Sequence, residues 1–263
     1  QRTAHRRDDM DRHAIEPRSE QPAPIAARSA WMTVEPRDLA HHVSMAAAVS
    51  APEANSGFDH LVDALVAQED ATDPRQAGHS HRVSVLATML GSSLGMDQRE
   101  LRDLRVAALL HDVGKILVPT EILRKDGPLS VVEAAAVRRH GIYGGSILRR
   151  IPALAFAAPA ARWHHERWDG IGYPDGLAGS AIPLFARIVA VADALDAMTS
   201  VRPYREAIGM QEAFMELEEQ SGAQVDPLVV SALGPLVGAP GFEAEVAEVA
   251  GTVRARSSLS TAA

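Results

Sequence analysis

Apolar residues recur at helical spacing along most of this chain, and no stretch alternates between apolar and polar residues as a half-buried strand would. The first clear run contains Phe58, Leu61, Val62, Leu65 and Val66. Residues spaced by three and four positions share one face of a helix, so these five form a single apolar stripe. The pattern predicts an all-α fold in which amphipathic helices bury their stripes against one another.

Helix boundaries are marked by capping residues. Ser130 followed three residues later by Glu133 is the pattern of a capping box. Asp226 followed by Pro227 supplies an N-cap and a proline in the first turn. We expect further helices over residues 83–90, 99–110, 130–140, 153–163 (despite Pro159), 182–198, 210–220 and 227–237.

The same patterns divide the chain into three parts. Residues 1–57 lack sustained periodicity and carry scattered Arg, Asp, Pro and Ala, so we expect a flexible or loosely attached region with at most a short helix over 31–50. Residues 58–238 hold all the periodic segments and are predicted to form one domain. Residues 239–263 are rich in Ala, Ser and Glu and are expected to form a tail.

Composition excludes several classes of protein. The chain has no cysteine, so disulfides and thiolate metal ligands are ruled out, and a reducing compartment such as the cytoplasm is compatible. A net charge of −8 argues against non-specific binding of polymeric nucleic acid. The longest apolar stretches are too short or too interrupted to span a membrane, and no secretory signal pattern is present. With 4% aromatic residues, the core must consist mainly of Ala, Val, Leu and Ile.

The most informative segment for function is 164–176. It opens with two adjacent histidines, His164 and His165, and continues as a loop with three glycines, one proline and two large aromatic residues. Neutral imidazole is a common ligand for transition metals, and glycine lets the backbone approach a ligand closely. A histidine pair alone is a weak signal, because such pairs also arise by chance.

Other candidate ligands stand in separate helical segments. His111 and Asp112 follow an apolar run at an expected helix end, where both side chains can face one site. Asp193 lies in an otherwise apolar helix, where an unpaired buried carboxylate would cost several kcal/mol. With His79 and His140, these residues predict a metal site assembled from separate helices, with Asp196 orienting a ligand imidazole. For the His111–Asp112 pair alone, a helix cap beside a packed core histidine is the competing interpretation.

Six motifs follow one another in order from about residue 58 to 238. They are His79-Ser80-x-Arg82-Val83, Leu110-His111-Asp112-Val113-Gly114-Lys115, Ile122-Leu123-x-Lys125-x-Gly127-Pro128-Leu129, His140, His164-His165-Glu166-x-x-Asp169-Gly170-x-Gly172-Tyr173-Pro174 and Asp193-x-x-Asp196-Ala197-Met198-Thr199-Ser200-x-Arg202-Pro203-Tyr204-Arg205. Together they resemble the HD-GYP family, bacterial metal-dependent phosphodiesterases of the HD superfamily that act on cyclic di-GMP. The resemblance implies an HD-superfamily helical bundle with the C-terminal extension of HD-GYP proteins.

The resemblance also implies a binuclear metal centre. The first ion would be held by His79, His111, Asp112 and Asp193, and the second by His140, His164 and His165, with Asp112 bridging the two. A nitrogen and oxygen ligand set suits iron or manganese. Two such ions can lower the pKa of a water from ~15.7 toward ~7 and clamp a phosphodiester.

The resemblance assigns further roles to residues around the metals. Lys115 is implied to contact the scissile phosphate, and Arg202 and Arg205 to bind substrate phosphate or guanine. Tyr173 is implied to line the guanine pocket, where Gly170 and Gly172 let the loop bend near the substrate. The glycine-rich loop is also expected to contact diguanylate-cyclase domains, and a homodimer is compatible with this reading.

One position departs from the family pattern. Some members carry a glutamate four residues before the first histidine, which supports a third metal, whereas this chain has Arg75 there. Because a cation repels a metal ion, we predict two metals and hydrolysis of cyclic di-GMP to linear pGpG, with GMP as a further product left open. Two alternatives remain at this point, a catalytically weak signalling module and a hydrolase of another cyclic dinucleotide.

Overall fold

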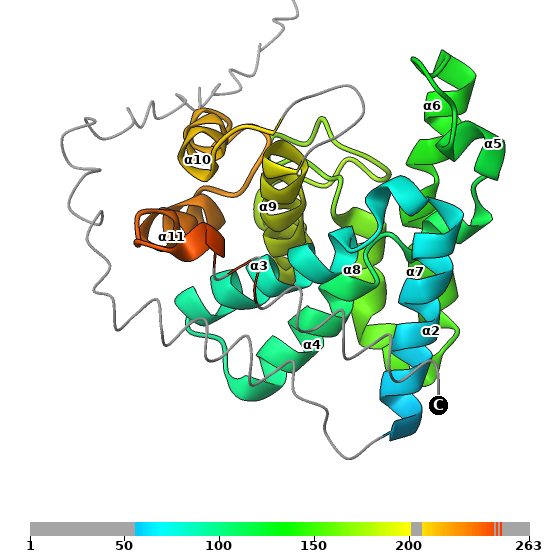
Figure 1. The fold of residues 1–263 in the computed structure, drawn as a ribbon, viewed down its shortest axis with the longest axis horizontal. Coiled ribbons are helices and arrows are strands. Elements are labelled where there is room, and N and C mark those ends of the chain that lie inside the picture. The colour runs from blue at the N-terminus through cyan, green and yellow to red at the C-terminus, as the bar shows by residue number, and fades with distance from the viewer. Residues whose placement is uncertain (1–55, 201–206, 245, 247, 249–263) are drawn as a thin grey trace, which may run out of the picture. The chain divides into compact units, whose positions relative to one another are not determined.

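The protein is all-α over the residues that the computed structural model describes, 56–200, 207–244, 246 and 248 (Figure 1). Within these ranges the chain forms no strand, and the only extended pairing is an isolated bridge between Ser221 and Val225. The all-α prediction is therefore confirmed. No helix in the described part of the chain is long and apolar enough to cross a membrane.

Over the described residues, ten α-helices are joined by short 3-10 helices. The α-helices are α2 (Ser56–Thr72), α3 (His79–Ser93), α4 (Gln98–Leu109), α5 (Thr120–Leu123), α6 (Val131–Arg138), α7 (His140–Arg149), α8 (Ala158–Trp163), α9 (Leu184–Thr199), α10 (Met210–Glu219) and α11 (Pro227–Val237) among the described residues. The 3-10 helices are η3 (Pro74–Gln76), η4 (Val113–Leu117), η5 (Pro152–Ala157) and η6 (Gly179–Ala181).

A central group of helices builds the core. Helix α3 packs against α4 and α9, while α7 packs against α8 and η4. Figure 1 shows α10 and α11 next to each other on one side of α9, with α5 and α6 on the other side. Aliphatic side chains fill the space between these helices, among them the fully buried Leu104, Leu110, Leu148, Leu195 and Leu233. The ends of α3, α4, α7 and α8 thereby meet beside the middle of α9.

The expected caps are present in the structure. Ser130 and Glu133 form a reciprocal capping box at the start of α6, where the Glu133 amide donates to the Ser130 hydroxyl at 3.3 Å. The carboxylate of Asp226 accepts from the Leu228 amide at 2.8 Å, and Pro227 opens α11. Both contacts satisfy amide groups that a helix N-terminus leaves without an intrahelical partner.

Helix α7 (His140–Arg149) was not predicted from the sequence, and two predicted segments have a different structure. The helix expected over 153–163 is instead the 3-10 helix η5 followed by α8, because Pro159 has no N–H and fits only the first turn of a helix. The expected tail from residue 239 begins with core residues, since Ala239, Phe242 and Val246 are buried in the main hydrophobic cluster. The helix considered for 31–50 lies outside the described residues.

Candidate metal centre

Seven predicted ligands converge where four helix ends meet the middle of α9. This arrangement places side chains from distant parts of the sequence in one buried site, although no single helix could present them together. They are His79 at the start of α3, His111 and Asp112 just after α4, His140 at the start of α7, His164 and His165 just after α8, and Asp193 within α9.

A close approach of backbone segments makes this convergence possible. A Cβ atom at Gly114, in η4, would lie 1.9 Å from the carbonyl oxygen of His140. No side chain fits in that space, so glycine allows η4 to lie directly against the start of α7. The close contact brings Asp112 and Lys115, which flank Gly114, next to His140.

Asp112 lies at the centre of the group. Its Oδ1 atom is 3.2 Å from Nε2 of His140 and 3.8 Å from Nε2 of His164. Its Oδ2 atom is 3.5 Å from Nε2 of His111 and 3.9 Å from Nε2 of His79. Each carboxylate oxygen therefore faces a different pair of imidazoles, which is the geometry required of a carboxylate that bridges two ions.

Three of the imidazoles are oriented by backbone carbonyl groups. A carbonyl oxygen only accepts hydrogen bonds, so the Nδ1 atom that contacts it must carry the proton and Nε2 must present its lone pair. The donors and acceptors are His111 Nδ1 to Ala108 O at 2.7 Å, His140 Nδ1 to Val137 O at 2.7 Å, and His164 Nδ1 to Ala160 O and Ala161 O, both at 3.2 Å.

His79 is oriented by a carboxylate instead. Its Nδ1 atom lies 2.7 Å from Asp196 Oδ2, and Asp196 also accepts from Arg82 Nε at 2.6 Å. On the other side of the ring, Nε2 lies 3.2 Å from Asp193 Oδ1. Burial alone would lower the pKa of His79, but hydrogen bonds with Asp193 and Asp196 raise it to about 9. Without a cation the ring therefore takes a second proton, at the position where a metal ion would bind.

The remaining histidines are neutral, and the Nε2 atoms of three of them face one another. Burial lowers the pKa of His140 and of His164 to about 4, so neither ring is charged at neutral pH. Nε2 of His140 lies 3.3 Å from Nε2 of His164 and 3.1 Å from Nε2 of His165, and the buried Nε2 of His111 has no hydrogen-bond partner. Facing lone pairs repel unless a cation lies among them. The donor set thus fits divalent metal ions.

The ligand atoms fall into groups that are close enough to hold an ion. Within each group the atoms lie within 4.8 Å of one another, and the groups are His140, His164 and His165; His79, His111 and Asp193; and His111, Asp112 and His164. The first two groups correspond to the division expected from the sequence, and the third contains the central carboxylate. The ions that these groups hold remain a prediction.

Lys115 lies beside the central carboxylate. Only 8% of its surface is exposed, and its Nζ atom donates to Asp112 Oδ2 and, at 3.0 Å, to Gln76 Oε1. Burial alone would lower the pKa of Lys115, but the negative charge of Asp112 raises it above its ordinary value. The ammonium group is therefore held charged at the site and does not extend into solvent.

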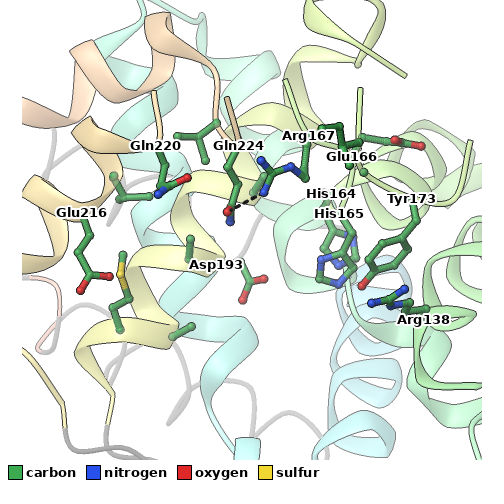
Figure 2. A pocket seen from close by; sticks show the side chains of 18 residues that line it. Arg138, His164, His165, Glu166, Arg167, Tyr173, Asp193, Glu216, Gln220 and Gln224 are labelled. Atoms are coloured by element: carbon green, nitrogen blue, oxygen red, sulfur yellow. Dashed lines mark hydrogen bonds between the residues drawn. The ribbon is translucent and has the colours of Figure 1, made fainter. Parts of the chain in front are cut away.

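Two cavities open onto the candidate metal centre and share His165, Tyr173 and Asp193 in their walls. The larger, of about 720 Å³, lies between the glycine-rich loop and helices α9 and α10 (Figure 2). The smaller, of about 420 Å³, is lined by Lys115 and by Gln76. A substrate bound at the centre can thus extend to both sides of the ligand cluster.

The glycine-rich loop is folded around a buried carboxylate. Glu166 accepts hydrogen bonds from the amides of Asp175 at 2.7 Å, Gly176 at 3.1 Å and Leu177 at 3.1 Å. A Cβ atom at Gly172 would lie 2.3 Å from the amide nitrogen of Arg167, so this glycine lets the loop fold back on its own start. The loop holds Tyr173 against His165, with their rings stacked at a centroid distance of 4.9 Å.

Comparison with known proteins identifies the family. The model of the HD domain matches residues 65–229. The chain belongs to the HD domain family. One curated relative is the cyclic di-GMP phosphodiesterase response regulator RpfG of Xanthomonas campestris, which is 44% identical to this HD protein over 168 residues. The match covers 62% of this chain and 44% of the relative. A cyclic di-GMP phosphodiesterase of Thermotoga maritima is 44% identical over 156 residues, covering 59% of this chain and 42% of the relative.

A further relative carries a different substrate in its name. The 3'3'-cGAMP-specific phosphodiesterase 3 of Vibrio cholerae is 40% identical over 164 residues, covering 62% of this HD protein and 36% of the relative. The chain thus spans less than half the length of these relatives. Among solved structures, a cyclic GMP-AMP-specific phosphodiesterase of Vibrio cholerae shares the fold with a TM-score of 0.58 at 22% identity, covering 74% of this chain and 53% of the other.

The residues predicted to bind substrate differ in whether they line the two cavities of the HD protein. Tyr173 lines both cavities and Gly172 lines the larger, whereas Gly170 lines neither. Arg202 and Arg205 lie outside the described residues.

Arg75 also lies at the site. It contacts Asp73 at 3.4 Å and donates to the carbonyl oxygen of Leu123. Asp73 lines the smaller cavity together with Arg75.

Three residues beside the ligand cluster of the HD protein had no role predicted from the sequence. Glu166 organises the glycine-rich loop, Gln76 contacts Lys115, and Arg138 lines the larger cavity. Glu166 stands directly after the histidine pair, but only the fold reveals the amides that it binds. Gln76 lies in a short polar segment and Arg138 at the end of a helix, and the sequence pattern leaves the direction of both side chains open.

Proposed function

We propose that this chain is a metal-dependent phosphodiesterase that hydrolyses cyclic di-GMP to linear pGpG in bacterial second-messenger signalling. The observation that carries the proposal is the paired ligand cluster around Asp112, which opens to a cavity on either side. The names of the relatives from Xanthomonas campestris and Thermotoga maritima support the same substrate. Both are cyclic di-GMP phosphodiesterases.

In this proposal the seven ligands hold two divalent ions, iron or manganese. His79, His111 and Asp193 would hold one ion and His140, His164 and His165 the other, with Asp112 between the two groups. When bound, the ions supply an acidified water and positive charge for cleavage of a phosphodiester. The low pKa values of His140 and His164 support ligation, because a ring that is already neutral needs to lose no proton before it binds a metal.

Lys115 stabilises the transition state. Its ammonium group is buried, charged and held by Asp112 and Gln76 at the wall of the smaller cavity. A phosphoryl group gains negative charge on its oxygens as water attacks, and a fixed cation beside it lowers the barrier without reorganising. Lys115 acts on the scissile phosphate in this way, while Tyr173 and Gly172 line the base pocket and Gly170 shapes the loop that carries them.

The lining of the smaller cavity supports pGpG as the product in this proposal. Arg75 pairs with Asp73 and donates to the carbonyl oxygen of Leu123 there, so its positive charge offsets the carboxylate of Asp73 in the same cavity wall. Two ions and release of pGpG follow in this proposal. In the same proposal, Arg202 and Arg205 bind substrate phosphate or guanine. The glycine-rich loop contacts diguanylate-cyclase domains. A cytoplasmic location and a homodimer remain predictions.

A mixed cyclic GMP–AMP dinucleotide is the second candidate substrate. The 40% identity to the cGAMP-specific enzyme of Vibrio cholerae is close to the 44% identity to the cyclic di-GMP enzymes. Both substrates carry two phosphodiesters in one ring and demand the same metal chemistry. They differ only in one base.

The test is turnover by the purified chain loaded anaerobically with Fe(II) or Mn(II). We expect chromatography to show pGpG from cyclic di-GMP, at a higher kcat/KM than for cyclic GMP–AMP. Asp112→Asn, which keeps the shape of the side chain but loses its charge, should abolish the product. No cleavage of cyclic di-GMP by protein with full metal content would refute the proposal, and a preference for cyclic GMP–AMP would establish the second candidate.

A further inference from the structure

We propose that Arg138 binds the second, non-scissile phosphate of the cyclic dinucleotide. This inference rests on the proposed function, because only a substrate with two phosphodiesters has such a group. It assigns a substrate contact within the described part of the chain, on a helix that carries none of the predicted ligands. Arg138 is the last residue of α6 and is exposed to the larger cavity.

The position of Arg138 is fixed by aromatic stacking. Its guanidinium carbon lies 5.4 Å from the centre of the Tyr173 ring, and Tyr173 in turn is stacked on His165. Figure 2 shows the arginine beside Tyr173, on the side of the cavity that carries the histidines. A guanidinium group over an aromatic face is held by cation–π attraction, which reduces the conformational freedom that binding would otherwise remove.

The charge of Arg138 is available to a ligand. The cavity has a second arginine, Arg167, but its Nε and Nη2 atoms donate to Asp169 at 3.1 and 2.6 Å, and Nη1 donates to Gln224 at 3.1 Å. No acidic side chain among the described residues lies within 4.0 Å of the Arg138 guanidinium. Arg138 can therefore offer its planar pair of N–H donors to a phosphate, whereas Arg167 already holds the loop.

The chemistry of the substrate requires a second anion site. One phosphodiester of a cyclic dinucleotide must lie at the metal ligands beside Lys115, and the ring then carries the other away from the centre. Arg138 lies against the ring of Tyr173, which itself packs on the expected ligand His165. The guanidinium therefore lies near the ligand cluster but is not one of the ligands. This is the position expected of a group that binds the non-scissile phosphate.

The chain offers a matched control. Arg139 follows directly, and its guanidinium carbon lies 5.4 Å from the ring of Tyr143, but it does not line the cavity. Arg138→Ala and Arg139→Ala each remove one arginine and one cation–π contact. Metal content is measured in both variants, because His140 is only two residues from Arg138. Arg138→Lys keeps the charge but loses the paired donors, and an intermediate effect is expected.

The experiment compares two substrates of the Mn(II)-loaded protein, cyclic di-GMP and bis(p-nitrophenyl) phosphate, which has one phosphodiester only. In Arg138→Ala the KM for cyclic di-GMP should rise roughly tenfold, as expected for a lost hydrogen bond to a charged group. The ratio of kcat/KM for cyclic di-GMP to that for the small diester should fall by a similar factor. Arg139→Ala should match the wild type in both measures.

Two results would overturn the assignment while leaving the proposed function intact. One is an unchanged KM for cyclic di-GMP in Arg138→Ala with full metal content. The other is an equal rise in KM for both substrates, which would place Arg138 on the scissile phosphate. A wild-type protein that neither binds nor cleaves cyclic di-GMP would refute the proposed function, and the assignment with it.

Discussion

Replacing Asp196 by asparagine should weaken metal binding although Asp196 is not expected to touch a metal. The side chain is 3% exposed, and its two oxygens accept from His79 Nδ1 at 2.7 Å and from Arg82 Nε at 2.6 Å. Asparagine has the same shape but only one acceptor oxygen. Its NH2 group must therefore face either the imidazole N–H or the guanidinium, and one of the two bonds is replaced by a contact between donors.

The size of the effect follows from the bond that is lost. Removing an outer partner of a ligating histidine commonly weakens metal affinity by roughly 10–100-fold, which corresponds to about 1.4–2.7 kcal/mol. A hydrogen bond to a charged group contributes a similar amount, about 1.5–3 kcal/mol. The two estimates agree because the same hydrogen bond fixes both the direction and the basicity of the His79 lone pair.

The assay is competition for Mn(II) between the protein and a fluorescent chelator. Asp196→Asn should show a metal Kd at least tenfold above that of the wild type, while its helical circular dichroism is retained. His60→Ala is the control, since His60 is exposed and lies away from the centre. A metal Kd within twofold of the wild-type value in folded Asp196→Asn protein would show that Asp196 does not position His79.

Four other changes test separate parts of the site. Asp112→Ala should remove nearly all bound metal by elemental analysis, whereas His60→Ala should retain it, and full metal in the Asp112 variant would refute the bridging role. Lys115→Ala should lower kcat much more than it raises KM, because its contact strengthens in the transition state; a change in KM alone would contradict this. Glu166→Gln should increase amide hydrogen exchange in residues 170–177, since a neutral acceptor holds those amides less tightly; unchanged exchange would argue against it. Burial and the charge of Asp112 raise the pKa of Glu69 from 4.5 to about 8. The folded, chelated protein therefore loses stability as pH rises through this window, and Glu69→Gln should reduce the loss in urea unfolding by on the order of a few kcal/mol; identical pH profiles would refute it.

The helices were predictable where local chemistry decides them. The capping box at Ser130 and the Asp226–Pro227 pair each satisfy backbone amides within a few residues, so sequence spacing alone was sufficient. The C-terminal boundary was not predictable in the same way. Phe242 and Val246 are buried only because distant helices leave room for them, and a short polar-flanked segment carries no sign of that space.

The motifs predicted which side chains meet in the cluster and that Asp196 orients an imidazole, whereas the backbone partners of the other rings were not predictable. His111, His140 and His164 each donate from Nδ1 to a carbonyl three or four residues upstream, and which carbonyl is reached depends on how each helix ends. The contacts of Glu166 and Arg138 depend in addition on where the glycine-rich loop folds relative to α6. Such contacts between segments distant in the sequence require the fold.

The candidate metal centre also differs from the rest of the protein interior in the polarity of its buried side chains. Elsewhere the buried side chains are almost all apolar, yet here Asp112, Lys115 and Glu69 are buried within one region. The Nε2 atom of His111 and the Oε2 atom of Glu69 have no hydrogen-bond partner, and each such group costs about 1–3 kcal/mol. A fold stabilised by its aliphatic core retains such unfavourable buried polar groups only where function requires them. Ligands with converging lone pairs and a fixed ammonium group are costly in the free protein and favourable once cations and a phosphate bind, and this difference argues for function independently of any relative.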